Sequence, residues 1–267
     1  MSFVKSKDGC RIYYECHDFD KARPLVAFLN GTTQTTRTWR PQVRHLQNSF
    51  TILLYDARGQ GQSDLGQADL TLDGHVNDLI ELLDHLGAGR THLVGLSHGA
   101  RVACRFGAKI PQRTGKVILC GLGRRLDPRT AALLNSWLHI LNSCSFEAMV
   151  WSMLPIVFGE PFLEQHKSIL HDMVSVIVKR NRADGIKAHL EAMIRYLPVT
   201  DSISEVYPPT IIVTGNQDLI VQKDQSRALA KMLEAHLFQL KGVGHSPNME
   251  APETFNHVIL QFLSAHK

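Results

Sequence analysis

The stretch HLVGLSHGAR, residues 92–101, decides the fold, because an apolar run ends there at a serine and a helical pattern begins. Residues 92–96 are typical of a short buried strand, and residues 99–110 place apolar side chains at helical spacing. Ser97 lies at the junction, with a glycine two residues away on either side. Because such glycines relieve crowding around a strained residue, the pattern predicts a strand, a sharp turn at Ser97, and a helix.

A serine at such a turn projects its hydroxyl from the carboxyl edge of the sheet, where it is able to act as a nucleophile. The next residue, His98, then offers a backbone N–H at the start of the helix, where anions are favoured. The alternative is a loop with incidental small residues. The five-residue pattern alone is weak, and its strand–turn–helix context makes it specific.

The bulk composition is that of an ordinary globular protein. The chain has 267 residues, of which 44% are hydrophobic and 20% charged, enough for one large α/β domain or two small ones. No run of 18 apolar residues occurs, and MSFVKSKDGCRIYY at the amino terminus lacks the apolar core of a signal peptide. We therefore expect no membrane association.

Cysteine and charge usage narrow the setting further. The five cysteines are odd in number and show no C-x-x-C spacing, which predicts reduced thiols and a cytoplasmic location. The net charge of +4 is mild and the basic residues are scattered, so nucleic-acid binding is not expected. The expected partner is a small-molecule acyl substrate, and a homodimer is left open.

Strand-like runs recur along the chain with helical patterns between most of them. The runs are residues 12–16, 25–29, 51–55, 92–96, 117–120, 211–214 and 236–240. Such alternation predicts an α/β fold, a mostly parallel eight-stranded sheet with helices on both faces. In sheets of this kind ligands bind beyond the carboxyl ends of the strands.

The alternation breaks after the sixth strand of the predicted sheet. Four helical stretches follow one another there: residues 128–141, begun by an Asp127–Pro128 pair; 146–153, ended by Pro155; 162–178; and 186–194. We predict a helical cap over residues 124–199, inserted in a core made of residues 1–123 and 200–267.

Ser97 needs a base and an orienting acid to act as a nucleophile. The strand TIIVTG is followed by NQDLIV, which places Asp218 just beyond a strand end, and HLFQLKG is followed by VGHSPNME, which places His245 in the next such loop. The chain order Ser, Asp, His is that of α/β-hydrolases. Asp218 is therefore the predicted acid and His245 the predicted base.

Other acids have simpler explanations. Asp127 caps a predicted helix, and Asp56 and Asp64 flank DARGQGQSD, which we interpret as a tight structural turn. For the oxyanion hole, VAFLNGTT ends a strand and turns at Asn30 and the following glycine, so the Thr32 N–H is able to join that of His98.

Together these motifs resemble the α/β-hydrolase fold superfamily over nearly the whole chain. The matching segments are NGTT, YDARGQGQSD, GLSHGA, TGNQD and GVGHSPNMEAPE. The resemblance implies a triad of Ser97, Asp218 and His245 with backbone N–H donors from Thr32 and His98. The segment NGTTQTTRTWRPQVRHL also resembles 3-hydroxyacyl transacylases and the acyltransferases that make rhamnolipid precursors. ARGQGQS and SHGA depart from those enzymes.

Side chains of the predicted cap are candidates for a substrate pocket, although an apolar stripe more often forms core. The candidates are Trp137, Met149, Trp151, Met153 and Phe158, with Asn30 at the predicted oxyanion turn. Arg124 and Arg125 are candidates for a phosphate contact with an acyl thioester, the alternative being solvated surface.

The sequence predicts a serine hydrolase that cleaves a carboxylic ester or thioester through an acyl-enzyme on Ser97. One alternative is an acyltransferase that moves a (3-hydroxy)acyl group from a thioester to an alcohol or thiol. Another is a binding protein on a hydrolase scaffold. No cofactor is expected and no metal, because the fourteen histidines show no H-E-x-x-H or similar spacing.

Overall fold

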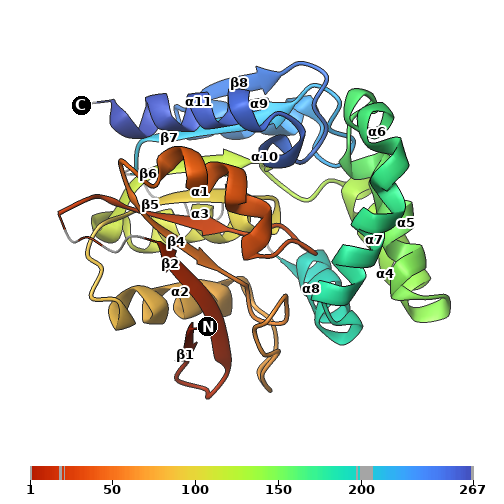
Figure 1. Ribbon diagram of the computed structural model, residues 1–267, viewed down its shortest axis with the longest axis horizontal. Coiled ribbons are helices and arrows are strands. Elements are labelled where there is room, and N and C mark those ends of the chain that lie inside the picture. The colour runs from red at the N-terminus through yellow and green to blue at the C-terminus, as the bar shows by residue number, and fades with distance from the viewer. Residues whose placement is uncertain (1, 18–19, 21, 197, 199–206, 266–267) are drawn as a thin grey trace.

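The structure is a computed structural model that describes residues 2–17, 20, 22–196, 198 and 207–265 (Figure 1). Its strands are β1 (Ser2–Lys5), β2 (Arg11–His17), β3 (Leu25–Leu29), β4 (Thr51–Tyr55), β5 (Thr91–Leu96), β6 (Thr114–Cys120), β7 (Thr210–Gly215) and β8 (His236–Leu240). Its α-helices are α1 (Arg40–Leu46), α2 (Leu72–His85), α3 (His98–Lys109), α4 (Pro128–Ser143), α5 (Phe146–Val157), α6 (Glu160–His166), α7 (Leu170–Arg180), α8 (Ala183–Arg195), α9 (Lys223–Met232), α10 (Pro247–Glu250) and α11 (Pro252–Ser264). Short 3₁₀ helices span Thr36–Trp39, Pro111–Arg113 and Lys167–Ile169.

The described strands form one eight-stranded sheet in the order β1-β2-β4-β3-β5-β6-β7-β8. β1 and β2 pair antiparallel, as do β2 and β4, and every pair from β4 to β8 is parallel. The predicted α/β fold with a mostly parallel sheet is confirmed. Sequence analysis missed β1, a four-residue edge strand of which only Val4 is buried.

Helices cover both faces of the sheet because strand side chains alternate between two apolar clusters. Leu25, Ala27 and Leu29 of β3 pack with α2, α3 and α9, whereas Val26 and Phe28 pack with α1 and α11 on the other face. Figure 1 shows these two helical layers with the sheet between them. The sheet is therefore buried on both sides, and its carboxyl edge is left for function.

The connection from β5 to α3 has the predicted sharp turn. Ser97 adopts φ 53° and ψ −113°, a backbone conformation that a residue with a Cβ rarely adopts. A Cβ on Gly95 would lie 2.4 Å from the carbonyl oxygen of Gly99, and one on Gly99 would lie 2.2 Å from that of Leu29. Both glycines are required because backbone occupies the space that a side chain would need.

Helices α4 to α8 gather at one end of the sheet and enclose an apolar cluster of their own (Figure 1). The predicted cap limits of 124 and 199 stay a prediction, and the boundary at 199–200 falls outside the described residues. The predicted start of α4 is observed: the Asp127 carboxylate accepts the N–H groups of Arg129 and Thr130, and Pro128 is the first helical residue.

Two cap predictions were wrong in detail. Pro155 does not end α5, which continues to Val157, because it lies in the last turn, where the lost hydrogen bond and the local distortion affect only the end of the helix. The single helix expected over 162–178 is instead α6, a 3₁₀ turn at Lys167–Ile169, and α7. Apolar spacing continues through this break, so the sequence pattern does not mark it.

Neither a membrane-spanning helix nor a disulfide is found among the described residues. In the part of the chain that the structure describes, no helix combines the length and apolarity needed to cross a membrane. All five cysteines are unpaired; Cys10, Cys104 and Cys120 are buried, Cys16 is half-buried and Cys144 is exposed.

The glycine before the turn provides a test of the elbow. Gly95→Ala should destabilise the protein by about 1–3 kcal/mol, because the new methyl group meets backbone that cannot move without breaking the turn. Gly89→Ala is the control, since nothing lies within 4 Å of a Cβ built there. Thermal unfolding of both variants measures the effect, at roughly 2–4 °C of Tm per kcal/mol. Equal Tm values for the two variants would contradict the described packing.

Candidate active site

Ser97 lies at the carboxyl end of β5, in the sharp turn that leads into α3. Its N–H donates to the carbonyl of Cys120 at the end of β6, at 2.8 Å, which fixes the turn to the neighbouring strand. Ser97 and His245 line the same cavity. The nucleophile and base predicted from sequence therefore face one space.

His245 and Asp218 form a buried pair. Nδ1 of His245 lies 2.9 Å from Oδ2 of Asp218, and their side chains are 5% and 1% exposed. A carboxylate only accepts, so Nδ1 carries the proton and Nε2 is left as the base. Oδ1 of Asp218 accepts the N–H groups of Ile220 and Val221, each at 2.9 Å, which holds the carboxylate in place. Nε2 of His245 is buried and has no hydrogen-bond partner among the described residues.

The pKa of His245 reflects opposing influences. Burial lowers the pKa, because it penalises the charged imidazolium. The negative charge of Asp218, its hydrogen bond and the more distant charge of Glu250 raise it by more, so the pKa lies above the ordinary value of 6.5. The geometry therefore favours an imidazole that accepts a proton readily and is stabilised once charged.

Glu250 holds the His245 loop and the cap together, a role that sequence analysis did not assign. Its Oε2 accepts the N–H groups of Gly244 and Gly159 at 2.8 Å, and its Oε1 accepts that of Ser246 at 2.9 Å. Burial raises the pKa of Glu250 while these three donors lower it. The segment GVGHSPNMEAPE carried the signal, because an acid closely follows the histidine.

The cap also contacts the backbone of the base directly. The N–H of His245 donates to the carbonyl of Val157, the last residue of α5, at 2.7 Å. A Cβ on Gly121 would lie 2.7 Å from Cε1 of His245, so the residue after β6 packs against the imidazole. The first contact holds the backbone of His245 and the second limits the position of its ring.

The predicted oxyanion loop lies beside the nucleophile. A Cβ on Gly31 would be 3.5 Å from Cβ of Ser97, and Thr32 lines the cavity. The loop is braced by Thr33, whose N–H donates to Oε1 of Gln60 at 2.7 Å and whose φ is 70°. His98 begins α3, so its N–H is one of the first four that lack a partner within the helix. The arrangement suits both N–H groups to an anionic oxygen at Ser97.

The cavity above Ser97 is mostly apolar and has a volume of about 140 Å³. Five residues predicted to bind substrate line it: Trp137, Met149, Met153, Phe158 and Arg125. All four apolar members also belong to the cluster enclosed by the cap helices. These four side chains therefore belong both to the core of the cap and to the wall of the cavity.

Three other predicted substrate residues do not line the cavity. The Asn30 amide donates to the Tyr55 carbonyl at 3.0 Å and accepts from the Trp39 indole at 2.7 Å, so it braces the loop instead. Trp151 packs edge-on against His171, with ring centroids 4.8 Å apart. Arg124 is exposed. For these residues the structure does not support the predicted contact.

The rival acids have structural roles in the described fold. Asp56 is 1% exposed and accepts the N–H groups of Thr36 and Gln62, at 2.8 and 2.9 Å. Burial raises its pKa to about 6. Asp64 pairs with Arg11 at 2.9 Å. Asp127 caps α4, as described above.

Arg101 is a cavity residue that sequence analysis missed. It lies on the first turn of α3 and lines the cavity with Ser97. Its Nη1 atom is buried and makes no hydrogen bond to the described residues. Burial lowers the pKa of Arg101, yet a guanidinium stays charged in proteins. Arg101 is the last residue of the GLSHGAR segment, but helical spacing alone does not reveal which side chain of a helix lines a cavity.

Comparison with known proteins places this geometry among hydrolytic enzymes. The alpha/beta hydrolase family matches residues 26–258 of the chain. A relative from Caulobacter segnis, named "Putative carbamate hydrolase RutD", is 24% identical over 258 residues, which cover 94% of this chain and 96% of the relative. The 3-oxoadipate enol-lactonase 2 of Acinetobacter baylyi is 22% identical over 237 residues, 89% of this chain and 87% of that protein.

Among solved structures, the enol-lactonase from Burkholderia xenovorans LB400 superposes with a TM-score of 0.90. The match covers 99% of this chain and 100% of that one at 22% identity. At this identity the likeness shows the fold alone.

The His245–Asp218 pair provides a pH test. Asp218→Asn should fold but lose about 10⁴-fold in ester turnover, because His245 loses its orientation and tautomer. In the wild type, kcat/KM should rise with pH through a pKa above 6.5, since only neutral His245 accepts the proton. In the variant this rise should move to lower pH, because burial then acts on His245 without the carboxylate.

Asp224→Asn is the matched control, because the Asp224 side chain is 92% exposed on α9. It should leave the pH profile and the turnover unchanged. A profile that stays in place in Asp218→Asn would show that His245 does not set it.

Proposed function

The chain belongs to the alpha/beta hydrolase family and is a hydrolase, and on this premise we propose that it cleaves carboxylic esters, lactones included, through an acyl-enzyme on Ser97. One observation carries the proposal: the buried 2.9 Å contact of His245 with Asp218, in a cavity that Ser97 shares. A histidine oriented by a carboxylate next to a strained serine is the arrangement that nucleophilic acyl transfer requires.

The proposed mechanism gives each of these residues one role. Nε2 of His245 takes the Ser97 proton as Oγ attacks the acyl carbon, and the N–H groups of Thr32 and His98 stabilise the resulting oxyanion. The imidazolium, stabilised by Asp218, gives its proton to the leaving alcohol, and the C–O bond breaks. A water molecule then attacks the acyl-enzyme, with His245 as base, and releases the acid and free Ser97.

The cavity favours a substrate with an apolar portion. Its walls are mostly apolar and include leucine, methionine and aromatic side chains. The relatives named above carry lactonase and carbamate hydrolase names, and both substrate types present a carbonyl that the same serine is able to attack. Thioesters are equally compatible with the mechanism.

Arg101 adds a preference for a charged substrate. Its buried Nη1 has donors to offer and no partner in the described part of the chain. A carboxylate on the substrate would satisfy this guanidinium with charge-assisted hydrogen bonds. We therefore assign to the enzyme a largely apolar ester or lactone that carries a carboxylate.

Hydrolysis is favoured over acyl transfer. The relatives named above carry hydrolase or lactonase names, and none of them supports the likeness of residues 30–46 to acyltransferases. Hydrolysis requires only a position for water, whereas transfer also requires a site for an acceptor.

An activated short-chain ester tests the proposal. Mass spectrometry should detect an acyl adduct on Ser97 and free acid as the main product, with 3-hydroxy acids or coenzyme A diverting only a minor share. A fluorophosphonate probe should label the wild type and fail on Ser97→Ala. Labelling that survives the substitution would remove the nucleophile, and transfer products that dominate would reverse the ranking of hydrolysis over transfer.

The role of Arg101 is tested with two esters of equal length, one neutral and one ending in a carboxylate. Arg101→Met should lower kcat/KM for the charged ester by about 10–100-fold, the loss expected for a hydrogen bond to a charged group. The neutral ester should change by no more than about 2-fold, less than one weak hydrogen bond. Arg124→Met, at an exposed site outside the cavity, is the control. Equal losses for both esters in Arg101→Met would contradict the assignment.

A further inference from the structure

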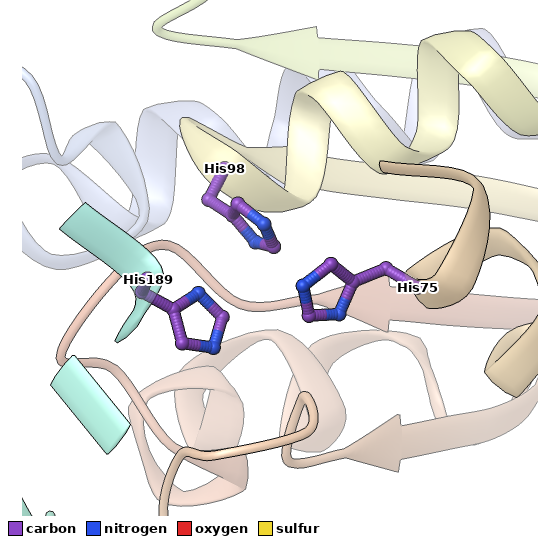
Figure 2. Close-up of side chains that lie close together, drawn as sticks. All are labelled: His75, His98 and His189. Atoms are coloured by element: carbon purple, nitrogen blue, oxygen red, sulfur yellow. The ribbon is translucent and has the colours of Figure 1, made fainter. Parts of the chain in front are cut away.

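Three buried histidines from distant parts of the sequence meet beneath the elbow. His75 comes from α2, His98 is the first residue of α3 and His189 comes from α8. Figure 2 shows their rings turned toward a common space, and one ring nitrogen of each lies within 4.8 Å of those of the other two. The residues are 2%, 1% and 0% exposed. None of them lines the cavity above Ser97.

Each of the three rings has an unpaired buried nitrogen. Nε2 of His75, Nδ1 of His98 and Nδ1 of His189 have no hydrogen-bond partner among the described residues. Buried polar atoms are nearly always paired, so three unpaired atoms in one place indicate a missing common partner. That partner must satisfy three nitrogens at once.

The other ring nitrogen of His189 makes a hydrogen bond that orients this ring. Its Nε2 lies 2.6 Å from the carbonyl oxygen of Arg58 and must donate, because a carbonyl only accepts. The proton is thus on Nε2, and Nδ1 presents a lone pair toward the other two rings. Metal-bound histidines typically show this pattern, with the second nitrogen donating to a carbonyl or carboxylate.

The positive charge near the cluster is compensated. The nearby Arg58 guanidinium is paired with Asp78 and Asp8, whose two carboxylates offset its charge.

We propose that His75, His98 and His189 form a binding site for one divalent transition-metal ion, with Zn²⁺ the best-suited. Three imidazoles leave a fourth position open, a set that tetrahedral Zn²⁺ accepts. Zn–N bonds of about 2.1 Å require the nitrogens to approach to roughly 3.4 Å. The present limit of 4.8 Å between ligand atoms must therefore shorten by about 1.4 Å on binding.

The role of the ion is structural. Because the three histidines lie outside the cavity, the ion does not touch the substrate. It joins core helices α2 and α3 to cap helix α8, and it anchors the residue whose N–H is assigned to the oxyanion hole. Sequence analysis found no ligand spacing because the three ligands come from three separate helices.

Metal binding is tested on the full chain without a histidine tag. Protein dialysed against a chelator should bind one Zn²⁺ per chain, measured by elemental mass spectrometry after removal of free metal. Saturating Zn²⁺ should raise Tm by several degrees, as expected from a ligand that binds only the folded state. Co²⁺ should give the visible absorption typical of tetrahedral coordination by nitrogen.

Two variants locate the site. His189→Gln should lose at least about 100-fold in Zn²⁺ affinity, together with the Co²⁺ absorption and the Tm rise, because loss of a ligand exceeds the 10–100-fold cost of losing an outer partner. His92→Gln is the control, a half-buried histidine outside the cluster whose Nδ1 accepts the Lys116 N–H at 2.8 Å. It should keep the metal response.

The wild-type measurements decide the proposal even if a variant fails to fold. Zn²⁺ well below one per chain, no Co²⁺ absorption and an unchanged Tm would show that the three rings only pack against one another, with centroids 4.6–5.1 Å apart. An equal loss of the response in His92→Gln and His189→Gln would also overturn it.

Discussion

The site depends on direct contact between the backbone of α3 and the backbone of β3 next to Ser97. A Cβ on Gly99 would lie 2.2 Å from the carbonyl oxygen of Leu29, so α3 begins in direct contact with the end of β3. This approach brings the loop after β3 beside the nucleophile. The strained conformation of Ser97 persists because the helix and both strands leave it no other position.

A second constraint is the turn of residues 56–64, which connects the sheet to the cap. Asp56 inside the turn accepts backbone N–H groups from two sides, and the carbonyl of Arg58 accepts from His189 of α8. A Cβ on Gly185 would lie 1.9 Å from the carbonyl oxygen of Gly59, so α8 contacts the turn at backbone distance. The YDARGQGQSD motif is thus a docking point for the cap as well as a tight turn.

The features that local sequence patterns predict are those that local physics determines. Short apolar runs located the parallel strands, period-3.6 spacing located α3, and the loops after β7 and β8 supplied Asp218 and His245. The glycine pair around Ser97 predicted the turn, because its strain is encoded within five residues.

Features that depend on tertiary partners escaped prediction. Asn30 is engaged by Tyr55 and Trp39, and no local pattern reveals those partners. The orientation of Arg101 toward the cavity, and the meeting of His75, His98 and His189, depend on how helices pack. The α6–α7 break keeps the apolar spacing and so leaves no trace in it.

The carbonyl of Val157 that accepts the His245 N–H changes how the cap should be regarded. Glu250 joins the same two regions by bonding to Gly159 and Gly244. The cap is therefore part of the scaffold that supports the base and not an interchangeable module. A cap transplanted from a relative would need to supply a carbonyl that accepts the His245 N–H and an N–H that donates to Glu250. Only caps that provide both groups could replace this one.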